Sequence, residues 1–162
     1  MGDVYTEQLI KRKRTGKDQM AKIALILFTI VLFILGMMIP YVEFIFLIMI
    51  GVDIYLFRNM DIEYEYLYIN GNLDIDKIMA KSRRKKAFEM NVSDLELLAP
   101  AGCPELRPFQ GLKAKNYTSG EEGRKAYEMI VLKNGAKQKI IFEPNDTIVD
   151  GMRMYAPRKV IR

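Results

Sequence analysis

Apolar residues are distributed unevenly along this chain of 162 residues. Residues 23–57 contain no lysine or arginine and only two acids. A helix needs about 20 apolar residues to cross a hydrocarbon core about 30 Å thick, so the stretch is long enough for two short spans. Gly36 and Pro40 interrupt it near its middle, and proline removes a helical hydrogen bond. We therefore expect a hairpin of two membrane-spanning helices, at about residues 20–39 and 41–57.

The two acids of the apolar stretch are Glu43 and Asp53. A carboxylate at the centre of a bilayer costs about 2.5–3.5 kcal/mol, and such residues commonly have a function. Glu43 follows Pro40 closely, and Asp53 lies about one helical turn before Arg58. We therefore expect both carboxylates to reach the headgroup region, with Lys22 as an alternative partner for Asp53.

After residue 61 the hydrophobic period changes to two, which is typical of β-strands. Residues 62–69 alternate in this way and end at Asn70-Gly71, a strong signal for a two-residue hairpin turn. A turn of that length places Tyr68 opposite Leu73 and continues with one mostly apolar face. It also places Glu65 opposite Asp76, a like-charge pair that costs only tenths of a kcal/mol when it is solvated.

A second hairpin is expected at Asn134-Gly135, where the loop length pairs Tyr127 with Phe142. Prolines indicate a loop between residues 100 and 108. Further strands are expected at residues 87–92, 95–98 and 112–117.

The last element expected is a helix. Asn145 is suited to cap it, and Ile148, Met152 and Tyr155 fall on one face before Pro157. Six or seven short antiparallel strands followed by one C-terminal helix predict a mainly β (α+β) domain, a pleckstrin-homology-like barrel plugged by its helix. An open α+β sheet with the helix across one face is the alternative.

The charges predict an orientation. The chain has 25 basic and 20 acidic residues, and its basic residues flank the apolar stretch but are missing from the turn around Pro40. Basic flanks stay on the cytoplasmic side, so both termini are expected in the cytoplasm and the chain in the cell membrane. The expected parts are a basic N-terminal segment (residues 1–19), the transmembrane hairpin (20–57) and a cytoplasmic β-rich domain with a C-terminal helix (58–162).

The composition argues against an enzyme. Histidine is absent, which removes the commonest general base and metal ligand, and the single Cys103 cannot form an internal disulfide. Asp74 and Asp76, with nearby acids, lack the glycine-centred loop of a calcium site. We expect no catalytic residue, no metal and no cofactor.

Two basic runs are the candidate binding residues. They are Lys11, Arg12, Lys13 and Arg14, and Arg83, Arg84, Lys85 and Lys86. One interpretation is a topology signal and a strand end that faces water. The other is contact with anionic lipid headgroups, worth about 1 kcal/mol for each basic residue near the surface, or with a protein partner. Nucleic acid is not expected, because the tyrosines alternate as core residues and offer no stacking platform.

Several segments together carry a family resemblance: Val4 to Leu9, Thr15 to Asp18, Glu63 to Ile78, Lys81 to Lys85, Phe142 to Asn145 and Tyr155 to Val160. They resemble an uncharacterised family of small two-span membrane proteins from clostridial-type Gram-positive bacteria. The resemblance implies a two-span topology and a cytoplasmic domain, and it brings no activity, ligand or catalytic residue.

These observations predict an integral membrane protein with a cytoplasmic binding domain, which recognises anionic lipid headgroups or a protein partner. The alternative is an accessory subunit or assembly factor of a larger membrane complex, bound through its transmembrane helices.

Overall fold

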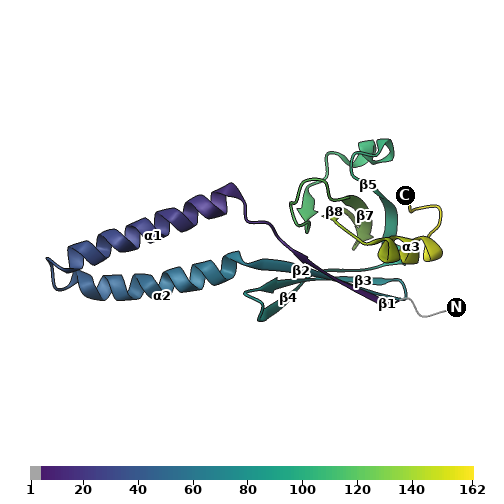
Figure 1. Cartoon of the computed structure of the whole chain (residues 1–162). Helices are drawn as coiled ribbons and strands as arrows, with labels where there is room; N and C mark the ends of the chain where they lie inside the picture. Colours follow the sequence, from purple (N-terminus) through teal and green to yellow (C-terminus); the bar gives the residue numbers. More distant parts are fainter. Residues whose placement is uncertain (1–4) are drawn as a thin grey trace. The chain divides into compact units, whose positions relative to one another are not determined.

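The computed structural model describes residues 5–162, and the chain divides into two compact units (Figure 1). The β domain comprises Met1–Arg12, Glu63–Ile78 and Arg84–Arg162, and the helical unit comprises Lys13–Ile62 with Met79–Arg83. The elements are, in order, β1 (Tyr5–Lys11), α1 (Gly16–Gly36), α2 (Val42–Met60), β2 (Ile62–Ile69), β3 (Asn72–Met79), β4 (Arg83–Asn91), η1 (Val92–Asp94), β5 (Leu95–Pro100), η2 (Pro104–Phe109), β6 (Ala114–Asn116), β7 (Tyr127–Lys133), β8 (Ala136–Phe142) and α3 (Asp146–Tyr155).

The helical unit is a hairpin of α1 and α2. Thr15 caps α1 in a reciprocal capping box: its hydroxyl accepts from the Asp18 N–H, and the Asp18 carboxylate accepts from the Thr15 N–H. The two helices are separated around Pro40, as the sequence predicts. Gly36 lets them approach, because a Cβ there would lie 3.3 Å from the backbone nitrogen of Glu43.

Only α1, among the helices that the structure describes, is long and apolar enough to cross a membrane, with a mean hydropathy of 2.2. The second helix, α2, has a similar length but carries Glu43, Asp53 and Arg58. The expected pair of spans is therefore supported for one helix, and the second span stays a prediction.

The first strand changes the expected domain boundaries. The pattern places residues 1–19 in a separate N-terminal segment, whereas the structure pairs β1 with β2 along its whole length, from Tyr5 opposite Ile69 to Lys11 opposite Glu63. Residues 1–4 lie outside the part of the chain that the structure describes. The helical hairpin is thus an insertion between two paired strands of the β domain.

The β domain contains two four-stranded sheets, with strand orders β1-β2-β3-β4 and β5-β7-β8-β6. The two predicted hairpin turns are present: Asn70 and Gly71 both have positive φ, as do Asn134 and Gly135. The predicted pairing of Tyr127 with Phe142 is also observed. The strand expected at residues 112–117 is the short β6, which pairs with β8 in parallel.

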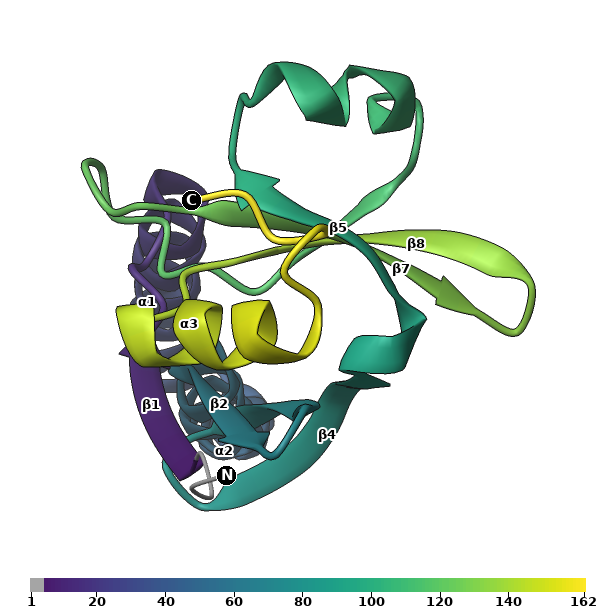
Figure 2. The ribbon, with the colours of Figure 1, turned by 90° about the vertical axis from the view of Figure 1, so that its right-hand side faces the viewer.

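Helix α3 lies between the two sheets (Figure 2). Asn145 caps it as expected, with its side-chain oxygen accepting from the Ile148 N–H at 2.9 Å. Ile148, Val149 and Met152 are buried, together with the apolar faces of both sheets. This arrangement of two sheets and a C-terminal helix is the predicted mixed α+β architecture, and the alternative of a single open sheet is not observed.

The second sheet has a covered outer face. The pattern predicts a plain loop after residue 100, but η2 folds back so that Leu106 packs with Ala99 and Ile130. Beside this cluster Lys139 and Glu128 form an ion pair of 2.7 Å between largely buried side chains. Prolines indicated the break in the strands correctly, but they carried no information on which surface the segment would cover.

Candidate functional site

The two basic runs both lie at boundaries between the units. Lys11 ends β1, and the chain passes from the β domain to the helical unit between Arg12 and Lys13. The second boundary falls between Arg83 and Arg84, at the start of β4. The sequence identified these residues by their charge alone; the structure shows that each run is a point where the chain passes between the two units.

Arg84 is held by two acids of its own sheet. Its guanidinium lies 2.6 Å from a carboxylate oxygen of Glu65 and 3.8 Å from one of Asp76. The expectation that these acids form a solvated like-charge pair is therefore wrong, because Glu65 is buried and an arginine lies between them. Burial raises the pKa of Glu65, a hydrogen bond with Glu7 adds to this, and the charge of Arg84 opposes it.

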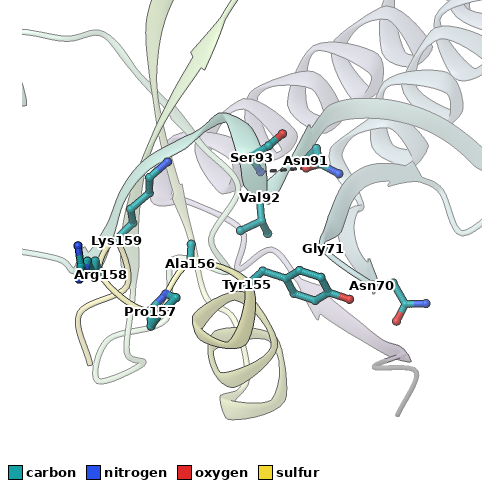
Figure 3. Close-up of a pocket in the computed structure, with 10 residues that line it drawn as sticks. All are labelled: Asn70, Gly71, Asn91, Val92, Ser93, Tyr155, Ala156, Pro157, Arg158 and Lys159. Carbon is teal, nitrogen blue, oxygen red and sulfur yellow. Dashed lines mark hydrogen bonds between the residues drawn. The ribbon is translucent and has the colours of Figure 1, made fainter. Parts of the chain in front are cut away.

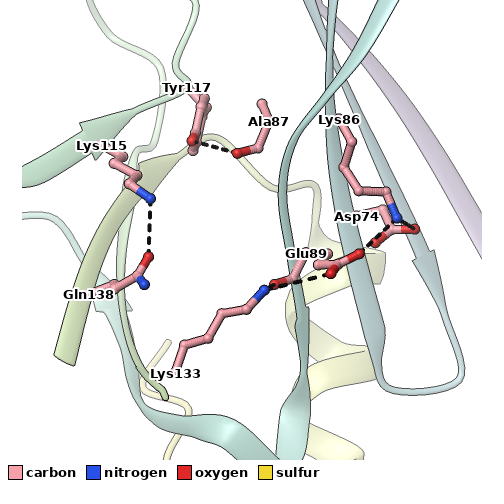
Figure 4. Close-up of polar contacts among 8 residues, drawn as sticks. All are labelled: Asp74, Lys86, Ala87, Glu89, Lys115, Tyr117, Lys133 and Gln138. Atoms are coloured by element: carbon pink, nitrogen blue, oxygen red, sulfur yellow. Dashed lines mark hydrogen bonds and ion pairs between the residues drawn. The ribbon is translucent and has the colours of Figure 1, made fainter. Parts of the chain in front are cut away.

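Lys86 is also engaged. Its ammonium lies 2.8 Å from Glu89 and 3.6 Å from Asp74 (Figure 4). Asp74 and Asp76, considered for a divalent cation, thus contact basic side chains. All four residues of this run are exposed, but Arg83 and Lys85 differ from their neighbours in that no ion pair engages either of them within residues 5–162. They are the two members of this run that remain available to a ligand.

The end of the helical hairpin that holds Arg14 and Lys22 also carries basic side chains. Arg14 lies 4.0 Å from Asp61, and the ammonium of Lys22 lies 5.1 Å from the centre of the Phe57 ring. Arg14, Lys22 and Phe57 border a hollow of about 320 Å³ within the helical unit. Lys22 therefore contacts an aromatic ring, and the alternative pairing with Asp53 is not observed.

Asp53 turns toward α1. Its carboxylate accepts a hydrogen bond of 2.6 Å from the Thr29 hydroxyl, and its second oxygen is buried without a partner among the described residues. The expected contact with headgroups is thus replaced by a contact inside the helix pair. Within residues 5–162, Asp53 is the one buried side chain of these two helices.

A hollow of about 430 Å³ lies in the β domain beside the end of α3 (Figure 3). The Tyr155 ring lies against Gly71, while Asn91 accepts a hydrogen bond from the Ser93 N–H. Arg158 borders the hollow, and Lys159 there donates to the Leu95 carbonyl at 2.6 Å. The groups that line the hollow and can bind a polar ligand are the amides of Asn70 and Asn91, the hydroxyl of Ser93, and the cations of Arg158 and Lys159.

A buried polar cluster joins the two sheets. Ser119 donates to the Glu143 carboxylate at 3.0 Å, and Tyr66 donates to the Tyr117 carbonyl at 2.6 Å. Gln8 of β1 uses both ends of its amide, donating to the Glu143 carbonyl and accepting from the Asn145 N–H. Sequence reasoning missed this cluster. Glu143, an acid that directly follows the buried Phe142, was the visible signal for it.

Comparison with known proteins gives one match. The model of a family described as a bacterial PH-like domain (DUF6106) matches residues 2–162. No curated protein and no solved structure matches the chain.

Proposed function

The chain belongs to this family of bacterial PH-like domains, and on that basis we propose that it is a membrane-anchored binding module whose β domain recognises anionic lipid headgroups. The membrane anchor is the hairpin of α1 and α2, with both chain termini in the cytoplasm.

The observation that carries the proposal is the distribution of side chains on the hairpin. Isoleucine, leucine, phenylalanine and valine side chains are exposed along both helices, while the buried residue is the carboxylate Asp53. In a water-soluble hairpin the apolar side chains would be inside. Such a large apolar surface has to be covered, and hydrocarbon covers it with no further protein.

The site of insertion supports a two-pass topology. Because Lys11 and Glu63 are paired neighbours, the chain leaves and re-enters the sheet at the same place. A segment that starts and ends at one place crosses the bilayer an even number of times. Lys13, Arg14, Lys17 and Arg58 lie at this end of the hairpin, as expected for its cytoplasmic side.

Headgroup recognition is proposed for the exposed members of the basic runs. Each run lies where the chain enters or leaves the helical unit, so an inserted hairpin brings both runs to the membrane surface. Arg83 and Lys85 are the strongest candidates, because Arg84 and Lys86 are engaged with acids of the β domain.

The test uses the full chain in nanodiscs that contain a photoactivatable anionic lipid. We expect crosslinks to the β domain that fall roughly five-fold in an Arg83→Ala/Lys85→Ala variant and fall with added salt. The matched control is Lys113→Ala/Lys125→Ala, which removes two exposed basic residues elsewhere in the chain, both in the β domain. Equal crosslinking of the two variants would reject headgroup recognition.

Anchoring is tested separately. The full chain should stay in membranes through an alkaline carbonate wash, and reporters fused to its two ends should both be cytoplasmic. Release by carbonate would reject the anchor. Extraction as a stable complex with another membrane protein would favour the alternative of an accessory subunit or assembly factor that binds through its helices.

A further inference from the structure

The outer edge of β4 borders a groove of about 300 Å³ in the β domain (Figure 4). β4 is the last strand of its sheet, and its other edge pairs with β3. Residues of β6, β7 and β8 form the opposite wall, among them Lys115, Lys133 and Gln138. The two sheets are therefore not joined by strand pairing along this line.

Side chains take the place of a neighbouring strand at the β4 edge. The Ala87 carbonyl accepts from the Tyr117 hydroxyl at 3.1 Å, and the Glu89 carbonyl accepts from the Lys133 ammonium at 3.1 Å. The two carbonyls are two residues apart, so they point to the same side of the strand. A strand edge whose backbone acceptors are met by side chains and not by another strand is a ready template for another chain.

The groove is basic. Lys86, Lys115 and Lys133 line it together with one acid, Glu89. The ammonium groups of Lys86 and Lys133 lie 2.8 Å and 3.7 Å from the Glu89 carboxylate, and Lys86 and then Lys133 lower the pKa of Glu89. Lys115 donates to the neutral amide of Gln138 at 3.1 Å, so its charge has no acidic partner in the groove.

We propose that this groove binds an extended acidic peptide segment of a protein partner, which adds a strand to β4. The backbone N–H groups of such a peptide replace Tyr117 and Lys133 as donors to the two carbonyls, and its carboxylates contact Lys115 and the released Lys133. A lipid phosphate offers acceptors only, so drawing Lys133 to it leaves the carbonyl of Glu89 without a donor. The chemistry of the groove therefore favours a peptide over a lipid.

The probe is a fluorescent peptide of about eight residues that alternates glutamate with threonine and valine, the length of a typical strand. Its binding to the full chain is followed by anisotropy in nanodiscs of zwitterionic lipid, where headgroup charge plays no part. We expect Lys115→Ala/Lys133→Ala to weaken binding about ten-fold, and the control Lys113→Ala/Lys125→Ala to leave it unchanged.

Two further variants separate strand addition from simple charge attraction. A peptide with N-methyl groups on alternate amides keeps its charge but loses the donors, and we expect it to bind about ten-fold more weakly. Tyr117→Phe keeps the ring that packs edge-on against Tyr64 but frees the Ala87 carbonyl, so the parent peptide should bind more tightly.

Equal binding of the parent and N-methylated peptides would overturn the proposal, and so would the absence of saturable binding. Displacement of the peptide by anionic vesicles in the Arg83→Ala/Lys85→Ala variant would reassign the groove to lipid and would also overturn it. Because the direct binding measurement in zwitterionic nanodiscs contains no anionic lipid, its failure is distinguishable from failure of headgroup recognition.

Discussion

The ring of Tyr68 occupies the space where a side chain at position 151 would begin. A Cβ on Gly151 would lie 2.5 Å from Cε1 of Tyr68, closer than carbon atoms approach in proteins. Glycine in the middle of α3 weakens the helix by itself, since it costs about 1 kcal/mol relative to alanine. The contact explains its presence: α3 lies against β2 because residue 151 has no side chain.

Gly151→Ala should destabilise the β domain by about 1–3 kcal/mol, because overpacking against a buried ring outweighs the gain in helix propensity. Urea unfolding followed by circular dichroism measures the change. In a Tyr68→Leu background the same substitution should cost much less, since the two residues are in contact. Gly51→Ala in α2, where nothing lies within 4 Å, is the matched control. A cost that is the same in both backgrounds would contradict the explanation.

The Tyr68 hydroxyl predicts that the stability of the folded protein depends on pH. Burial, and then the neighbouring Tyr155, raise the pKa of Tyr68 to about 12 from its ordinary value of 10.0. The folded state therefore holds this proton more tightly than the unfolded state, and the resulting stability is present below pH 10 and lost as the pH rises toward 12. Tyr68→Phe should flatten this part of the stability profile, measured by urea midpoints across that range. A profile parallel to that of the parent protein would refute the assignment.

The insertion of α1 and α2 predicts that they are separable from the β domain. Replacing residues 13–61 with Asn-Gly connects Arg12 to Ile62 through a two-residue hairpin turn, because β1 and β2 are already paired antiparallel neighbours. This variant should be soluble and should unfold cooperatively. Residues 58–162 alone lack β1 and should fold poorly, and equal stability of the two proteins would show that β1 is dispensable.

Three of the four basic residues at the start of β4 should divide into two classes. Arg84→Ala removes the partner of the buried Glu65 and should destabilise the domain by about 1–2 kcal/mol. Arg83→Ala and Lys85→Ala should change the stability by less than about 0.5 kcal/mol, because they remove exposed side chains without ion pairs among the described residues. Thermal unfolding of the three variants measures the difference, and equal effects would contradict it.

The Thr29–Asp53 contact predicts an asymmetry within the helical hairpin. Thr29→Val leaves a buried carboxylate without its donor and should loosen the helix pair. Asp53→Leu removes the carboxylate altogether, and Thr29→Val/Asp53→Leu should pack about as well as the parent. Unfolding of the full chain in mixed micelles with increasing SDS gives the order of stability. A double variant weaker than Thr29→Val alone would argue for a role of the pair beyond packing.

Local sequence patterns were sufficient to predict most of the helices, strands and turns. Asn-Gly pairs require the positive φ that both β-hairpin turns adopt, so turns and register could be predicted from a few neighbouring residues. Asn145 and the 3.6-residue period located α3, and Pro40 located the break between the two long helices. These features depend on sequence neighbours, which is why one sequence was enough to predict them.

The candidate site was predictable only in part, because charge shows which residues are basic but not which are already paired. Arg84 meets Glu65 and Asp76 from neighbouring strands, and the groove beside β4 combines Lys86 with residues about 30 and 50 positions further on. Such pairings depend on how separate strands are aligned.

The sequence by itself determined the apolar hairpin, the two Asn-Gly turns, the final helix and the two basic runs, since each rests on local periodicity or composition. Only the tertiary structure decided that β1 belongs to the sheet, that Asp53 faces Thr29, and that the β4 edge is closed by Tyr117 and Lys133. Those contacts join residues 24 to 64 positions apart in the chain, and folding brings them together through strand pairing and burial, which no local pattern encodes.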